Sequence, residues 1–295
     1  KVVGEALAFA PRILIAEGNT QERCEKMKAV GSTIGSSAYA KSIKQVCPNA
    51  EIDVIFAADS DQSLPTGTSF DGYDGFILGG SALNLPTDAD NPKITCQIDL
   101  ARAAFKAKIP FLGSCWGLQI AACAAGGVVG VNPRGREVGF ARKITLTNAG
   151  RAAAYYEGKA TVFDSPAIHF DEVTHLPAGS IVLAENNHTS VQAAIIRFDG
   201  GTFWGMQYHP EFDLAHVSGL IRVYAKSMTD DGLYATEADA LSHASEMDLL
   251  YQNPNRQDLA WLLGVDADVL DPDVRLCEVA NWVDQSVMAR YVAKQ

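Results

Sequence analysis

The stretch Ile109-Pro-Phe-Leu-Gly-Ser-Cys-Trp-Gly-Leu-Gln119 decides the fold. It begins with an apolar, β-rich run at residues 109–112, and an alanine-rich run follows from Gln119 to Ala125. This change predicts a strand that turns sharply into a helix at Cys115. Gly113 and Gly117 stand two residues before and two residues after Cys115, where the absence of a side chain relieves the crowding of such a turn.

Three further apolar runs lie upstream, at residues 13–16, 52–56 and 75–78, and helix-compatible segments separate them. Strands that alternate with helices form crossover units, and their sheet is mostly parallel and covered on both faces. The sequence therefore predicts a doubly wound α/β domain.

The segment from Val138 to Tyr208 contains closely spaced apolar runs with Gly, Asn and Asp turns between them. Asp199-Gly-Gly201 separates two of these runs, and such a sequence is typical of a β-hairpin. We expect this segment to add antiparallel strands to the same domain.

Beyond Thr229 the pattern becomes helical again. Thr236-Glu-Ala-Asp239 predicts a capping box, and Asp271-Pro272 predicts an N-cap followed by proline in the first turn. The last helix carries an apolar face with helical spacing, formed by Leu276, Val279, Ala280, Val283 and Val287. This face either covers the main domain or forms a dimer or partner-subunit surface. We therefore expect a main domain at residues 1–228 and a helical extension at residues 229–295.

Composition narrows the classes of function. The chain has 295 residues, of which 47% are hydrophobic and 20% charged, as is typical of a soluble globular protein. Its net charge is −11 and it has no block of Lys and Arg, which disfavours a nucleic-acid binder. No apolar stretch approaches the ~18 residues that a membrane helix needs. We expect small-molecule or protein partners, with a homo-oligomer among the alternatives, and neither nucleic acid nor membrane.

The start of the chain and the cysteines bear on its location. Residues 1–10 faintly resemble a secretory signal, but Glu5 interrupts them and a strand-like run follows at once, so we interpret them as native sequence. The six cysteines show no Cys-x-x-Cys spacing and no dense framework, which argues against a zinc site and a disulfide scaffold. These features favour a cytoplasmic protein.

Cys115 is the candidate nucleophile. The N-terminus of the helix that follows it presents free N–H groups and a dipole that favour an anion, so a thiolate and a developing oxyanion would both be stabilised there. A cysteine is more often a small buried hydrophobe, and we assign that role to the other five.

His209-Pro-Glu211 supplies a candidate base and a group to orient it. A thiol nucleophile needs a base that later protonates the leaving amine, and that base needs a third group to fix its tautomer. Residues two apart in extended chain point the same way, so Glu211 can reach the far ring nitrogen of His209. Both motifs follow predicted strands, at the edge where α/β sites form. We therefore expect a Cys115–His209–Glu211 triad.

These motifs resemble those of class I glutamine amidotransferases, which read Gly-x-Cys-x-Gly-x-Gln and His-Pro-Glu. The resemblance covers residues 11–228, and residues 167–177 are most similar to the glutaminase portion of GMP synthetases and their stand-alone relatives, including γ-glutamyl amide hydrolases. It implies a flavodoxin-like fold, a Cys–His–Glu triad and a γ-glutamyl thioester intermediate. It also implies an oxyanion hole from the N–H groups of Gly80 and Trp116, and substrate contacts from Gln119 and His169.

The chain departs from the family pattern at two places. The glycine-rich loop of the family often has proline where this chain has Ser81-Ala82, and the family domain normally ends soon after the His-Pro-Glu helix. His169, Asp171 and His175 suggest a metal cluster by composition alone, but their spacing matches no zinc pattern. We expect neither a metal nor a cofactor.

The fate of the nitrogen stays open at this point. The chain contains no P-loop and no pyrophosphatase-type loop, so nucleotide chemistry is not expected in it. One interpretation is a free-standing hydrolase of glutamine, or of an N-substituted γ-glutamyl amide that a glutamine-synthetase-like partner makes. In it, aromatic residues either flank an apolar amine or belong to the core: Trp116, Tyr208 and Phe212. A second is a glutaminase subunit that delivers ammonia to a separate synthetase. A third is a silent binding or regulatory subunit of the same fold, which the intact triad disfavours.

Overall fold

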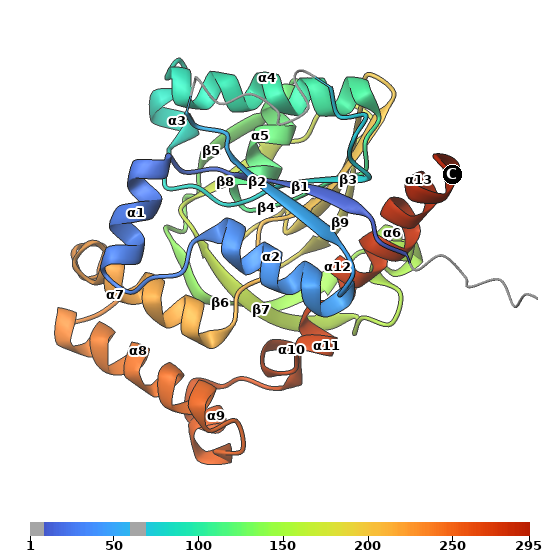
Figure 1. The fold of residues 1–295 in the computed structure, drawn as a ribbon. Coiled ribbons are helices and arrows are strands. Elements are labelled where there is room, and N and C mark those ends of the chain that lie inside the picture. Colours follow the sequence, from blue (N-terminus) through green and yellow to red (C-terminus); the bar gives the residue numbers. More distant parts are fainter. Residues whose placement is uncertain (1–8, 60–68) are drawn as a thin grey trace, which may run out of the picture.

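A computed structural model describes residues 9–59 and 69–295, and it is built on one nine-stranded sheet (Figure 1). The first eight residues, interpreted above as native sequence, lie outside this part of the chain. From one edge to the other the strands are β2 (Glu51–Phe56), β1 (Arg12–Glu17), β3 (Gly75–Leu78), β4 (Phe111–Ser114), β11 (Gly201–Met206), β10 (Ala193–Phe198), β9 (Ile181–Glu185), β6 (Glu137–Leu146) and β7 (Val162–His169). The first five run parallel, and the last four are added antiparallel.

The four predicted parallel strands are all present. The fourth begins at Phe111 rather than at residue 109, because Pro110 has no N–H to donate to a neighbouring strand. Its carbonyl is still paired, with the N–H of Phe76 at 2.9 Å. The doubly wound, mostly parallel fold class is confirmed.

Helices cover both faces of the parallel strands (Figure 1). On one face, α4 (Pro92–Ala107) and α5 (Trp116–Ala124) close an apolar core with side chains such as Phe76, Phe111 and Phe203. On the other face, the helix α2 (Gly35–Val46), the 3-10 turn η1 (Ala154–Tyr156) and α12 (Cys277–Trp282) close a second core. The carboxyl ends of the strands stay free of these layers, and that edge is where a site can form.

The antiparallel half follows from the expected hairpin. β10 and β11 are joined by Asp199 and Gly200, with φ of 48° and 77°, and two positive values are the mark of a type I′ turn. A separate antiparallel pair, β5 (Val128–Val131) and β8 (Asp171–His175), packs against α5. Short helices complete this part of the chain: α1 (Gln21–Ala29), α3 (Leu85–Asp88) and α6 (Asn148–Ala152).

The C-terminal third begins with α7 (Leu214–Asp230), along which α8 (Glu237–Gln252) packs. Both expected caps are present, because Thr236 and Asp239 form a capping box and Asp271 caps a helix with Pro272 in its first turn. The remaining elements are α9 (Gln257–Leu263), α10 (Ala267–Leu270), α11 (Pro272–Arg275), α12, the π-helical turn η2 (Val283–Val287) and α13 (Met288–Ala293).

The apolar face of the last helix packs on the main body rather than on a partner. Four of its five predicted members are buried in the second core, and Ala280 is half-buried. Trp282 from the same segment lies so close to Gly75 at the start of β3 that an added Cβ there would be 2.7 Å away. The division at residue 228 stays a prediction.

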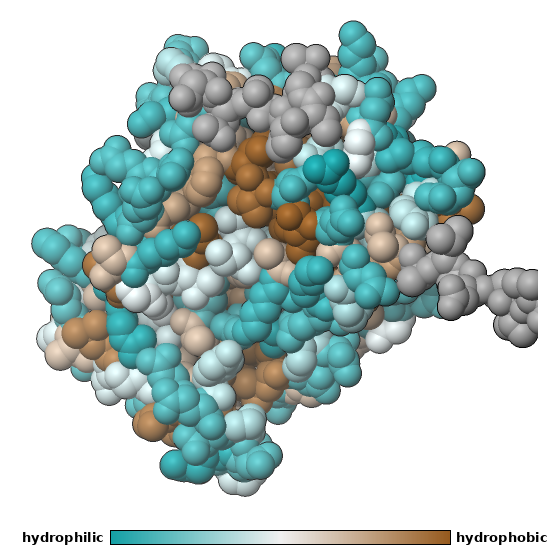
Figure 2. All heavy atoms as spheres, in the orientation of Figure 1, coloured by the Kyte–Doolittle hydropathy of each residue, from teal (hydrophilic) through white to brown (hydrophobic). Residues whose placement is uncertain are grey.

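Two surface features complete the description. In Figure 2 the largest group of hydrophobic side chains on this face lies over the edge strand β2, where Val54 is 42% exposed. Within residues 9–59 and 69–295, none of the helices combines the length and the apolar character needed to span a membrane.

Candidate active site

Cys115 lies at the turn between β4 and α5. Its φ of 50° and ψ of −101° are unusual for a residue with a side chain. Gly117 makes this turn sterically accessible, because a Cβ there would lie 2.3 Å from the carbonyl oxygen of Leu78. The N–H of Cys115 donates to the carbonyl of Met206 at 2.7 Å, so the neighbouring strand also holds the turn. The thiol lines a cavity at the carboxyl edge of the sheet.

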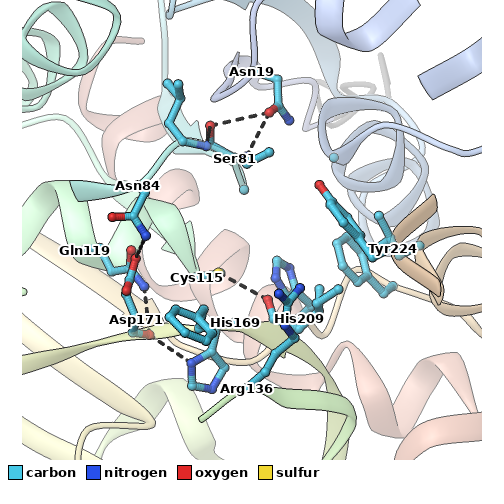
Figure 3. Close-up of a pocket in the computed structure, with 18 of the residues that line it drawn as sticks. Asn19, Ser81, Asn84, Cys115, Gln119, Arg136, His169, Asp171, His209 and Tyr224 are labelled. Atoms are coloured by element: carbon cyan, nitrogen blue, oxygen red, sulfur yellow. Dashed lines mark hydrogen bonds between the residues drawn. The ribbon is translucent and has the colours of Figure 1, made fainter. Parts of the chain in front are cut away.

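His209 and Glu211 lie in the turn after β11, the strand beside β4. Nδ1 of His209 is 2.7 Å from Oε1 of Glu211, and both side chains are buried. The hydroxyl of Ser114 donates to the same carboxylate oxygen at 2.7 Å. Since Nδ1 is engaged, Nε2 is the ring nitrogen left for Cys115. The structure therefore brings the three predicted residues together, and Figure 3 shows Cys115 and His209 in the cavity.

The neighbours of His209 set its charge. Burial lowers the pKa of His209, but the negative charge of Glu211 and hydrogen bonds to Cys115 and Glu211 outweigh it and raise this pKa to about 10. Phe212 stacks on the ring with centroids 3.9 Å apart, and His216 stacks on Phe212 at 3.7 Å. Burial, together with the charge of His209, lowers the pKa of His216 to about 3. At neutral pH this stack therefore contains one imidazolium and one neutral imidazole.

The loop after β3 approaches the triad from another side. A Cβ on Gly80 would lie 3.3 Å from Cε1 of His209, so the backbone of this loop lies against the catalytic ring. Asn19 fixes the loop, because its Oδ1 accepts hydrogen bonds from the N–H of Ala82 at 2.9 Å and the hydroxyl of Ser81 at 3.5 Å. Hydrogen bonds thus hold the loop where the family often has proline.

Trp116 is the first residue of α5, so its N–H has no partner within the helix. Gly80 lines the cavity beside the imidazole of His209, and Trp116 directly follows the nucleophile. The oxyanion hole itself stays a prediction.

One wall of the cavity is polar (Figure 3). Nε2 of Gln119 donates to the carbonyl of Asp171 at 3.1 Å, and Asn84 donates to Oδ2 of Asp171 at 2.9 Å. The other carboxylate oxygen of Asp171 is buried and has no hydrogen-bond partner in the described chain, and burial raises the pKa of this carboxyl. His169 also lies in this wall, with Nδ1 2.9 Å from the carbonyl of Asp171 and Nε2 2.7 Å from Glu137. Both of its nitrogens are engaged, so His169 holds the wall in shape.

Tyr208 does not line the cavity, and the prediction of a substrate contact for it is wrong. Its side chain is fully buried in the second core, where the hydroxyl is 2.6 Å from that of Tyr156 and donates to Glu278 at 2.8 Å. Neighbouring residues in extended chain point to opposite faces, so Tyr208 points away from the site that His209 enters. Trp116 is likewise buried, with Nε1 bonded to Gln97. Of the three aromatic residues expected around the amine, Phe212 alone lines the cavity.

The rest of the lining comes from α1, from α7 and from segments next to β6, β7 and α7, and Figure 3 shows Tyr224 of α7 across the cavity from Asp171. Its apolar members are Met27, Ile168, Phe212 and Leu220. Its polar members are Arg136, Tyr224, Ser227 and Asp231. The guanidinium of Arg136 lies 2.9 Å from the carboxylate of Asp231, so its charge is already balanced within the chain. The whole cavity has a volume of about 350 Å³.

His169, Asp171 and His175 do not converge on a metal position. The ring nitrogens of His169 have partners, and His175 is exposed beside the hydroxyl of Thr174. The described residues hold no group of three His, Cys, Asp or Glu side chains that could bind a metal ion.

Several site residues were not predicted from the sequence. Asn19 follows an apolar strand by two residues, and this position at the carboxyl edge of a parallel sheet is a signal that could have found it. Met27, Arg136 and Tyr224 reach the cavity from α1, from the segment before β6 and from α7. Their proximity depends on tertiary packing, which no local pattern contains.

A doubly wound sheet, a cysteine on a strained strand-to-helix turn and a histidine held by a carboxylate define a cysteine-nucleophile amidohydrolase. The family model of glutamine amidotransferase class-I matches residues 38–218. The chain therefore belongs to this family, and the expected membership is confirmed.

Individual relatives agree with this assignment. The chain is 33% identical over 286 residues to a gamma-glutamyl-L-1-hydroxyisopropylamide hydrolase of a Pseudomonas species, and the match covers 94% of this chain and 93% of that protein. It is 31% identical over 149 residues to one component of a glutamine-hydrolysing GMP synthase of Ignicoccus hospitalis, covering 50% and 72% respectively. Among solved structures, a glutamine amidotransferase from Thermotoga maritima has a TM-score of 0.64 and 15% identity, and covers 95% of this chain and 99% of its own. The last similarity concerns the fold alone.

Proposed function

We propose that this enzyme hydrolyses N-substituted γ-glutamyl amides, releasing glutamate and an amine with an apolar substituent. The observation that carries the proposal is the lining of the cavity, because Cys115 shares it with an apolar wall formed by Met27 of α1, Phe212 and Leu220 of α7. Glutamine releases only ammonia, which carries no apolar substituent that could contact that wall.

The chemistry follows from the triad. The thiolate of Cys115 attacks the γ-carbonyl, and the N–H groups of Gly80 and Trp116 stabilise the oxyanion, a contribution typically worth about 3–4 kcal/mol per good donor. The imidazolium of His209 gives its proton to the leaving nitrogen as the C–N bond breaks and a γ-glutamyl thioester forms. His209 then takes a proton from water, the hydroxide adds to the thioester, and glutamate leaves as the thiolate is restored.

The polar wall suits the glutamate end of the substrate. Asp171 lines the cavity and has a buried, unpaired carboxylate oxygen, and an α-ammonium group would supply a hydrogen-bond partner for it. Gln119 closes the same wall from α5. His169 and Glu137 support it from behind through their own hydrogen bond.

The amine end meets a wall with an apolar body and few polar groups. Met27, Phe212 and Leu220 can contact an alkyl or aryl group, and burying such a group gains free energy in proportion to its apolar area. The Arg136–Asp231 pair leaves no net charge for a charged amine substituent to meet. A neutral substituent, with at most a hydroxyl, therefore fits best. The hydroxyisopropylamide in the name of the Pseudomonas relative has this character.

Substrate competition tests the proposal. The purified chain is incubated with glutamine and with N-alkyl and N-aryl γ-glutamyl amides, and kcat/KM is measured for each. Met27→Trp narrows the apolar wall, so kcat/KM for bulky amides should fall by about 10-fold or more, while that for glutamine changes little. Lys28→Trp, an exposed neighbour on the same helix, is the matched control and should change neither. A wild-type preference for glutamine would overturn the assignment.

The alternative is a glutaminase subunit that passes ammonia to a separate synthetase, and the similarity to a component of a GMP synthase favours it. The same substrate assay separates the two functions, because a glutaminase of that kind would be inactive by itself and active only with its synthetase. A silent protein of the same fold would neither turn over substrate nor react at Cys115 with a glutamine-like electrophile.

A cytoplasmic location is part of the proposal. All six cysteines are free thiols, as expected in a reducing compartment. Thiol labelling of the protein from its native cells, followed by mass analysis without a reducing agent, should modify all six cysteines. A disulfide would contradict the location.

A further inference from the structure

The helical extension contacts the catalytic turn directly. Arg275, in α11, donates from Nε to the carbonyl oxygen of Pro210 at 3.0 Å, and Pro210 is the residue between His209 and Glu211. A second nitrogen of Arg275 donates to the carbonyl of Val269 at 2.8 Å, which fixes the side chain on its own segment. Arg275 is 7% exposed, so water does not substitute for these bonds.

A second contact reaches the residue just before His209. The hydroxyl of Tyr208 donates to Oε1 of Glu278 in α12 at 2.8 Å. Oε2 of Glu278 is 2.7 Å from the ammonium of Lys159, and both side chains of this ion pair are almost completely buried. The hydroxyl of Tyr156 completes the group, 2.6 Å from that of Tyr208. The extension therefore holds the His-Pro-Glu turn at two points, one on each side of His209.

We propose that Arg275 and Glu278 are positioning residues for the triad, so that the extension, which lies outside the matched family segment, is part of the catalytic apparatus. The inference rests on hydrolysis by the triad and not on which amine leaves. Neither residue touches the substrate cavity, so both act through the turn that they hold.

Stability alone is a weak explanation for these contacts. A buried ion pair loses about as much by desolvation as it gains by attraction, and apolar residues of similar volume often stabilise a core as well. What the buried group of Lys159, Glu278 and Tyr208 does provide is one fixed orientation of α12 against the end of β11. Glu211 depends on such fixation, because its second carboxylate oxygen is buried without a hydrogen-bond partner in the described chain. Apart from His209, the side chain of Ser114 alone holds that carboxylate among the described residues, so the position of the turn backbone also decides how Glu211 meets His209.

The experiment compares Arg275→Gln and Arg275→Lys in the full chain with a γ-glutamyl amide that the wild type cleaves. Arg275→Gln removes the donor to Pro210, and a small misplacement of reacting groups costs up to about 100-fold in rate. We expect kcat to fall by about 10- to 100-fold with KM unchanged, since the substrate walls are intact. Arg275→Lys keeps the charge and one donor, and it should restore much of kcat.

Lys294→Gln is the matched control. Lys294 also ties the extension to the main body, through Asp74 at 2.8 Å and the carbonyl of Tyr73, but it does not contact the catalytic turn. It should leave kcat unchanged. Equal losses in Lys294→Gln and Arg275→Gln would overturn the proposal, because general loosening would then explain both.

Two further measurements separate positioning of the triad from a loss of folded protein. Tyr208→Phe keeps the ring and removes one hydroxyl, and it should lower kcat by a smaller factor, again with KM unchanged. Labelling with a diazoketone analogue of glutamine counts reactive Cys115 without turnover, so kcat is expressed per reactive site. If Arg275→Gln and Tyr208→Phe both keep the wild-type kcat per reactive site, the positioning role is overturned. If the wild-type protein itself neither reacts with the diazoketone nor hydrolyses the amide, the proposed function is overturned instead.

Discussion

At the scale of single residues, the site depends on the charge of His209. Its imidazolium exists below a pKa of about 10 and is lost as the pH rises through that value, and it is the proton donor for the leaving amine. Activity of the wild type should therefore decline on the alkaline side near pH 10.

Glu211→Gln tests the origin of that charge. It removes the negative charge that raises the pKa of His209, so the alkaline decline should move to lower pH. It also removes the acceptor that fixes the tautomer, and kcat should fall on the order of 10³-fold or more. The pH profile of kcat/KM measures both effects, with the exposed Glu185→Gln as control. If the alkaline decline of kcat/KM in Glu211→Gln stays at the wild-type pH, Glu211 does not raise the pKa of His209.

His216 has the opposite electrostatic character. Its pKa is lowered to about 3 in the folded state, against ~6.5 in the unfolded chain, so the unfolded state binds more protons between these values. Stability from this residue is therefore present above pH ~6.5 and is lost as the pH falls below it, by about 2 kcal/mol between pH 7.5 and pH 5.

The variant His216→Phe keeps a ring to stack on Phe212 but cannot take up a proton. Urea denaturation at pH 7.5 and pH 5 should show a smaller loss of the free energy of unfolding on acidification than in the wild type. Identical losses in the two proteins would show that His216 is not the residue responsible.

Site residues were predicted correctly from the sequence where the spacing within a motif determines how its side chains lie. The spacing of Cys115, His209 and Glu211 in their motifs led to residues that the fold brings together. Tyr208 failed because a one-residue offset at a strand end reverses the face to which a side chain points. Asp171 was not among the predicted substrate contacts, because its orphaned oxygen is visible only once Asn84 and the cavity are in place.

At the scale of elements, the contact between α5 and β3 sets the position of the nucleophile. A Cβ on Gly117 would lie 2.3 Å from the backbone oxygen of Leu78, which no side-chain rotation can relieve. Gly117→Ala must therefore push α5 away from the sheet, and we expect a loss of roughly 1–3 kcal/mol in the free energy of unfolding, together with a loss of activity.

Gly219→Ala, in the middle of α7, is the matched control. The nearest atom to its added Cβ is Oγ of Ser32 at 3.4 Å, an ordinary contact, so the better helix propensity of alanine should stabilise by roughly 0.5–1 kcal/mol. Thermal or urea denaturation measures the change in the free energy of unfolding of both variants, and we expect a decrease for Gly117→Ala and an increase for Gly219→Ala. A tolerated Gly117→Ala would mean that the elbow does not need glycine.

Local signals predicted elements well and their ends less well. The hairpin and the two helix caps were predicted, though not the type of the turn, because the residues that make them are close in sequence. The helix expected after the turn at Cys115 begins at Trp116, before the alanine-rich run that starts at Gln119. The last helix is divided by the π-helical turn η2, although its apolar face persists through the break.

At the scale of the whole molecule, the extension joins the main body through α12 and α13. Trp282 is 1% exposed and lies against Gly75, and Arg290 donates to the carbonyl of Tyr73 at 3.0 Å. These contacts lie at the start of β3, the strand whose other end leads to the loop of Gly80. Sequence patterns predicted that the extension is helical but could not predict which face of the sheet it covers, because that depends on shape complementarity between distant segments.

The contact of Trp282 with β3 can be used to test whether the boundary at residue 228 separates two folding units. Trp282→Ala leaves a cavity against β3, and the loss of a buried aromatic side chain typically costs about 3–5 kcal/mol. If the chain folds as one unit, the whole unfolding transition in guanidinium chloride shifts to lower concentration and remains single, by fluorescence and by far-UV circular dichroism alike. Trp261→Ala, on α9, is the control, because Trp261 is 73% exposed and its loss should change stability by about 0.5 kcal/mol or less. An early transition confined to part of the signal, with the main transition unmoved, would show instead that the extension unfolds by itself and that the main domain does not need it to stay folded.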